Sequence, residues 1–145
     1  MDESSTTRLL EHVLLPVAHE DDARETALAL EPYSPTRVTV THVVEKGGGT
    51  PDKTPVSHSE EVATTAYDEV HRIFPDAETH TTYEEDVVEG IFDAARDVEA
   101  TAIAFQAREG GRIVRFLSGD ISLKLVTNAE IPVVCLPSAP SKDTL

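Results

Sequence analysis

One short segment, residues 108–124, has the residue types that anion binding requires. Four of the chain's 12 basic residues lie there beside only two acidic ones, although the whole chain has a net charge of −15. The basic residues are Arg108, Arg112, Arg115 and Lys124, and the acidic ones are Glu109 and Asp120. Gly110 and Gly111 allow successive backbone N–H groups to converge on an anion, and arginines bind phosphate oxygens in pairs. The segment could therefore hold a small anion or a nucleotide; alternatively, its arginines form salt bridges to nearby carboxylates or to a partner chain.

No other residue pattern indicates catalysis or metal binding. The six histidines (His12, His19, His42, His58, His71 and His80) lack paired metal-ligand spacing, so no metal site is predicted. Ser118 is not in a nucleophile-elbow motif, and no catalytic residue can be named. The single cysteine, Cys135, lies in the apolar run 131–136, which predicts a buried and inert thiol. We expect no enzyme activity.

Alternating hydrophobic periods predict the elements that position these residues. Strands are expected over residues 12–18, 36–44, 77–83, 102–105 and 132–136. Helices are expected after cap candidates Asp21 and Asp22, over residues 62–74, over 87–98 and near 121–128, and His42 is expected to pack within its strand. Residues 46–55, with three glycines and two prolines, are predicted to be a loop, and residues 106–119 a turn.

Strands that alternate with helices indicate a single α/β domain, a doubly wound five-stranded parallel sheet with helices on both faces. The domain is expected to occupy residues 1–145, with a core over about 12–137. Ligands of such sheets bind outside the carboxyl ends of the strands. The candidate nucleotide or anion site therefore combines Ala18, Arg108, Gly110, Gly111, Arg112, Arg115, Ser118, Gly119 and Asp120.

In several segments, in order, the chain resembles the universal stress protein family. These are Val13-Leu14-Leu15-Pro16-Val17, Thr41-His42-Val43-Val44, and the stretch from Gly119 through Lys124 to Ile131-Pro132-Val133-Val134. The resemblance implies the strand order 3-2-1-4-5. It also implies homodimers that pair through the last strand, here Pro132, Val133, Val134, Cys135 and Leu136. The alternative is that this strand is merely buried under its own helices.

Members of the family that bind ATP share a GxxGx9G[ST] motif after the fourth strand and an Asp after the first. At the matching positions this chain has Gln106, Glu109, Gly119 and Asp120, with Ala18 in place of the Asp. Side chains at the glycine positions block close approach of the backbone to a phosphate, and Asp120 places negative charge at a helix start. We therefore expect no cofactor, with ATP or AMP as the alternative.

The charge pattern bears on partners and location. The chain has 27 acidic residues, dispersed along its length, and no stretch of about 20 apolar residues. This composition argues against nucleic-acid and membrane partners, indicates a cytoplasmic protein and is typical of adaptation to high salt. Two hypotheses remain: a non-catalytic stress-response module that acts through dimerisation and an unknown protein partner, or a nucleotide- or anion-binding switch or weak nucleotidase at residues 108–120.

Overall fold

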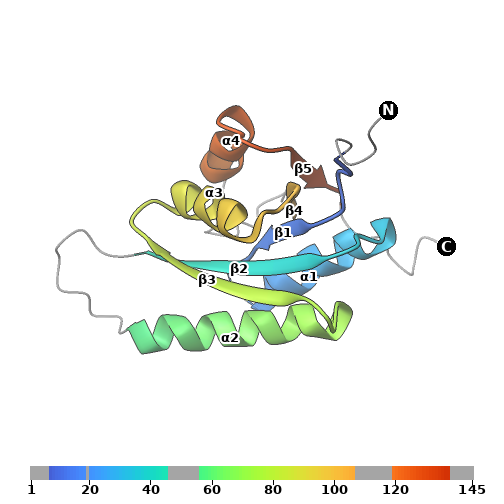
Figure 1. Ribbon diagram of the computed structural model, residues 1–145. Helices are drawn as coiled ribbons and strands as arrows, with labels where there is room; N and C mark the ends of the chain where they lie inside the picture. Colours follow the sequence, from blue (N-terminus) through green and yellow to red (C-terminus); the bar gives the residue numbers. More distant parts are fainter. Residues whose placement is uncertain (1–6, 19, 46–55, 107–118, 138–145) are drawn as a thin grey trace.

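The computed structural model describes residues 7–18, 20–45, 56–106 and 119–137, in which strands and helices alternate (Figure 1). Among these residues a short 3₁₀ helix, η2, spans Glu31–Tyr33. The strands are β1 (Val13–Pro16), β2 (Val38–Glu45), β3 (Glu78–Glu84), β4 (Ala102–Gln106) and β5 (Val133–Leu136). The α-helices are α1 (Glu20–Leu30), α2 (Val56–Ile73), α3 (Val87–Val98) and α4 (Gly119–Thr127).

The five strands form one parallel sheet in the order β3-β2-β1-β4-β5, which confirms the predicted fold class. Val13 lies opposite Val38 on β2 and opposite Ala102 on β4, so β1 is the central strand. β3 and β5 are the two edges of the sheet. The predicted loop over residues 46–55 and most of the predicted turn lie outside the described residues.

Helices cover both faces of the sheet because the central strands are apolar on both sides. Along β1, Val13 and Leu15 pack into the core beneath α1 and α2, whereas Leu14 packs into the core beneath α3 and α4. Figure 1 shows α1 and α2 on one side of the sheet and α3 and α4 on the other. A strand buried on both faces has a continuous apolar run instead of alternation. None of the helices in the described ranges is long and apolar enough to span a membrane.

Cys135 differs from its prediction, because the structure shows it exposed instead of buried. An apolar run predicts burial only where neighbours cover the strand on all sides. Within the described ranges, β5 has a neighbouring strand, β4, on one flank only. Val133 and Val134 are half-buried and Leu136 is buried, so the helices cover β5 unevenly.

Gly90 allows α3 to approach the sheet closely. A Cβ at this position would lie 2.8 Å from Cγ1 and 3.1 Å from Cγ2 of Val43, a buried residue of β2. Valine is stiff at χ1, so its methyl groups cannot rotate away without cost. We expect Gly90→Ala to lower the free energy of unfolding by about 1–2 kcal/mol, because overpacking exceeds the gain in helix propensity. Urea unfolding measures this change.

A double-mutant cycle isolates the Gly90–Val43 contact. Val43→Ala removes the two methyl groups that lie nearest to a new Cβ, and the contact with Cβ of Glu84, at 3.3 Å, remains. In that background Gly90→Ala should be neutral or stabilising by up to about 1 kcal/mol, as expected for an alanine in a helix. An equal destabilisation in both backgrounds would show that the contact does not limit the approach of α3.

His12 makes folding sensitive to acid. Its side chain is 3% exposed; Nε2 lies 2.7 Å from Oγ1 of Thr39, and Nδ1 has no hydrogen-bond partner among the described residues. Burial, and then the charge of Arg37, lower the pKa of His12, while the backbone of Glu99 and the carboxylate of Glu78 oppose them. The folded state therefore favours the neutral imidazole.

We expect stability to fall as the pH drops below 6.5, the ordinary pKa of histidine, because the unfolded chain then binds a proton that folded His12 excludes. This loss of stability is complete once the pH has fallen below the lowered pKa of His12 in the folded state. The slope from this one group is at most about 1.4 kcal/mol per pH unit. Urea unfolding of wild type and His12→Gln between pH 7.5 and 5.5 tests this, and parallel pH profiles for the two proteins would contradict it.

Candidate functional site

The candidate crevice lies where the carboxyl ends of β1 and β4 meet, at the point where the strand order reverses. From β1 the chain crosses through α1 to β2 on one side, whereas β4 lies on the other side of β1. Side chains and amides at these strand ends are the ones that a ligand of a doubly wound sheet would meet. The described residues that bear on this region are Ala18, Asp22, His42 and Gln106.

The Asp22 carboxylate accepts a hydrogen bond from the backbone amide of Ala18. The Ala18 N–H donates to the Asp22 carboxylate, at 3.0 Å to Oδ2 and 3.3 Å to Oδ1. Asp22 is only 3% exposed and belongs to the first turn of α1, together with Glu20 and Asp21. A carboxylate here satisfies a backbone donor and interacts favourably with the positive end of the helix. The start of α1 therefore already holds an anion, one supplied by the chain itself.

Of the two predicted cap candidates, Asp22 makes this contact with the backbone. Asp21 is exposed and accepts a hydrogen bond from Arg24 instead, at 3.0 Å. The sequence placed Asp22 at a helix start, and the contact of its carboxylate with the Ala18 amide was not predicted. The signal was available in its spacing, since a carboxylate in the first helical turn often binds a backbone N–H just before the helix.

Gln106 fills the end of β4. Its side chain is 6% exposed, and its Oε1 has no hydrogen-bond partner among the described residues. A buried amide oxygen without a partner costs about 1–3 kcal/mol. Gln106 therefore takes space where a glycine would leave the backbone bare.

His42 holds the ends of β1 and β2 together. Its Nδ1 lies 3.1 Å from the carbonyl oxygen of Val17 and donates to it, and the Val17 N–H donates to the carbonyl of Thr41 at 2.9 Å. The side chain is buried. The prediction that His42 packs within its strand is confirmed, and this contact gives it a structural role.

The remaining predicted site residues are placed only in part. Gly119 and Asp120 form the start of α4. Outside the described residues lie Arg108, Gly110, Gly111, Arg112, Arg115 and Ser118. Within the described ranges, no group of three or more His, Cys, Asp or Glu side chains could hold a metal ion.

A comparison with protein families agrees with the fold. The model of the universal stress protein family matches residues 9–137. The chain therefore belongs to the universal stress protein family. No curated protein sequence matches it significantly.

Several solved structures share the fold. A universal stress protein from Archaeoglobus fulgidus in complex with dAMP is 21% identical, with a TM-score of 0.64 over 89% of this chain and 99% of that one. The protein UspA from Lactobacillus plantarum is 20% identical, with a TM-score of 0.61 over 90% and 99%. A universal stress protein in complex with cAMP is 13% identical, with a TM-score of 0.61 over 86% and 95%. At these identities the likeness establishes the fold.

Proposed function

We propose that this protein is a non-catalytic stress-response or regulatory module that acts as a homodimer and does not bind ATP in the mode of the family's ATP-binding members. The observation that carries this proposal is the placement of two of the chain's own side chains at the carboxyl ends of β1 and β4. Asp22 binds the Ala18 amide, and Gln106 is buried at the end of β4.

The side chains of Asp22 and Gln106 both disfavour nucleotide binding. A phosphate needs close approach to backbone amides, which a side chain at position 106 hinders where the ATP-binding members have glycine. A nucleotide would also bring negative charge toward the buried carboxylate of Asp22, and like charges in a site of low dielectric repel strongly. The sequence adds Glu109 and Asp120 at two further positions of the family motif.

The open edge of β5 supports the homodimer. β5 is an edge strand with half-buried Val133 and Val134, and Cys135 is exposed. α4, the helix that leads into β5, exposes Leu123 to 62% and Val126 to 53%. An apolar edge strand is a template for pairing with another chain. A second copy that pairs antiparallel with β5 would extend the sheet and cover this edge.

Restoring the family motif tests whether the residues at the motif positions prevent ATP binding. The variant Ala18→Asp/Gln106→Gly/Glu109→Gly/Asp120→Ser should bind ATP at least about 100-fold more tightly than wild type, corresponding to about 2.7 kcal/mol. The matched control keeps Gln106 and changes only the other three positions, and it should recover less of the affinity. Circular dichroism verifies that both variants are folded. Equal ATP affinity of wild type and the fourfold variant would contradict the proposal.

A second candidate function is a nucleotide- or anion-binding switch at residues 108–120. The Oε1 of Gln106, which has no hydrogen-bond partner in the described part of the chain, favours it, because a polar ligand could donate a hydrogen bond there. Two proteins of this fold are known in complex with dAMP and cAMP. If wild type binds a nucleotide or phosphate, Arg112→Ala and Gly111→Val should abolish the binding. Retained binding in both variants would place the ligand elsewhere.

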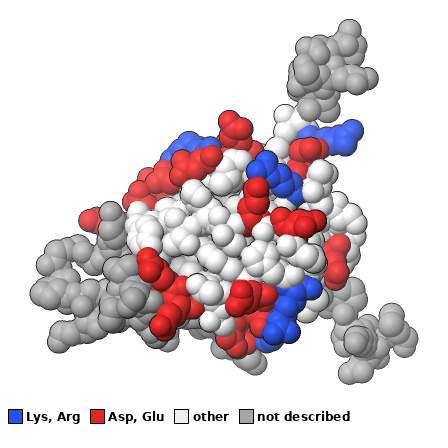
Figure 2. All heavy atoms as spheres, turned by 60° about the horizontal axis from the view of Figure 1, so that its bottom comes forward, with Lys and Arg blue, Asp and Glu red and all other residues white. Residues whose placement is uncertain are grey.

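The surface charge supports adaptation to salt-rich surroundings. Figure 2 shows acidic side chains spread over the face it presents, with uncharged surface between them. Four of the five arginines in the described ranges, Arg24, Arg37, Arg72 and Arg96, form ion pairs with carboxylates. These pairs are largely exposed and contribute little stability, so most of the acidic excess is left to repel itself.

A further inference from the structure

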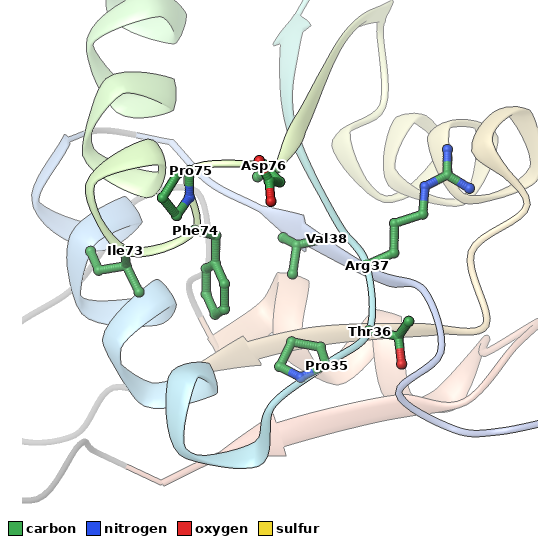
Figure 3. A pocket seen from close by; sticks show the side chains of 9 residues that line it. Pro35, Thr36, Arg37, Val38, Ile73, Phe74, Pro75 and Asp76 are labelled. Carbon is green, nitrogen blue, oxygen red and sulfur yellow. The ribbon is translucent and has the colours of Figure 1, made fainter.

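A half-open pocket lies at the amino end of β2, at the opposite end of the strands from the crevice. It encloses about 230 Å³ between the segment that enters β2 and the segment that leaves α2 (Figure 3). This volume is below the roughly 300–1,000 Å³ of sites for larger ligands, so the pocket suits a molecule of a few carbon atoms. Its apolar lining consists of Pro35, Val38, Ile73, Phe74, Pro75 and Ala77.

Asp76 supplies a negative charge at the mouth of this pocket. Figure 3 shows its carboxylate over the space between the Phe74 ring and Val38. Asp76 is exposed and belongs to none of the ion pairs among the described residues. Its charge is therefore available to a ligand.

Two further features favour a positively charged ligand. The half-buried aromatic ring of Phe74 lines the pocket, and the face of an aromatic ring attracts cations. The 18-residue helix α2 ends at Ile73, so the partial negative charge of its C-terminus adjoins the same space.

Arg37, the basic residue in the pocket lining, does not place its positive charge beside Phe74. Arg37 extends away from the space beside Phe74, as Figure 3 shows. Its guanidinium donates to Oε1 of Glu78 at 2.7 Å, which offsets its charge. The pocket thus combines an apolar wall, an aromatic ring and a carboxylate that has no ion-pair partner in the described part of the chain.

We propose that this pocket binds a small organic ammonium ion, with the cation between Asp76 and Phe74 and the apolar part against Pro35 and Ile73. The proposal is independent of the function proposed for the crevice, because it uses residues at the other end of the sheet. An ammonium group with alkyl substituents matches both the charge and the apolar lining.

Nuclear magnetic resonance titration of the full chain with choline chloride tests the proposal. The control ligand is 3,3-dimethylbutan-1-ol, which has the shape of choline without its charge. Choline should shift the amide signals of Phe74, Asp76 and Ala77 saturably, with a Kd of about 1–10 mM, and the neutral alcohol should bind at least about tenfold more weakly. The titration is performed at the lowest salt concentration at which the protein is folded, because salt screens exposed charges.

Variants separate this site from general attraction to an acidic surface. Asp76→Asn should weaken choline binding about tenfold, and Phe74→Leu, which keeps an apolar wall, should weaken it several-fold. The matched control is Asp68→Asn, which removes an exposed charge of α2 away from the pocket and should leave the affinity unchanged. Non-saturating shifts spread over the acidic surface, equal binding of the neutral alcohol, or an unchanged affinity of Asp76→Asn would each overturn the proposal.

Discussion

Val134→Asp is expected to convert the protein from a homodimer to a monomer. In an antiparallel pairing of two β5 strands, the substitution places two like charges close together across the new strand pair. We expect the dimer Kd to rise at least about 100-fold, corresponding to about 2.7 kcal/mol. Sedimentation velocity at micromolar protein concentration, in high salt, measures the change.

Cys135 provides the control for this experiment. Val134 is half-buried against the core, so its substitution also affects the monomer. Cys135 is exposed, and Cys135→Asp should dissociate the dimer while the monomer stays folded.

Because Cys135 is the only cysteine, a thiol crosslinker with a spacer of about 8 Å should join two wild-type chains, since paired strands lie about 5 Å apart. A strictly monomeric wild type, or a dimer that neither substitution affects, would contradict pairing through β5.

Thermal stability is expected to rise with salt. With a net charge of −15, the folded chain repels itself at low ionic strength, and the Debye length falls from about 10 Å at 0.1 M to about 3 Å at 1 M. We expect a gain of about 3 kcal/mol between 0.1 and 2 M KCl, or roughly 10 °C in Tm for a chain of this size. Melting curves across that series measure it.

A charge-reduced variant distinguishes screening from a general effect of salt. Glu61→Gln, Asp68→Asn and Glu85→Gln remove three exposed carboxylates that form no ion pairs among the described residues. The triple variant should be more stable than wild type at 0.1 M KCl and should gain less from added salt. A flat or falling Tm in wild type, or an identical salt dependence in both proteins, would refute the screening account.

The fold could be predicted from the sequence because its signals are local. The apolar run at residues 13–17 and the helical stripe at 87–98 follow periods of burial that the backbone imposes. Strand order came from the family resemblance, since periodicity does not state which strands are neighbours. The error at Cys135 has the same origin, because an apolar run does not reveal that its strand is an edge with one open flank.

The crevice could be predicted only in part. The sequence identified Ala18 and Gln106 as departures from the ATP-binding pattern, and the structure adds that Gln106 is buried. The contact between Asp22 and the Ala18 amide was missed because it depends on how the chain enters α1. The pocket around Phe74 and Asp76 was also missed, since it brings together two segments that are separated along the chain and carry no motif.

Isothermal titration of the wild-type protein with ATP and Mg²⁺ tests the central claim most directly. We expect no heat of binding at micromolar nucleotide, because Asp22 binds the Ala18 amide, Gln106 is buried at the end of β4, and Glu109 and Asp120 stand where the family resemblance places glycine and Ser or Thr. A Kd below about 10 μM, or roughly 7 kcal/mol of binding free energy, would contradict it. Such binding would make the protein a nucleotide-dependent switch.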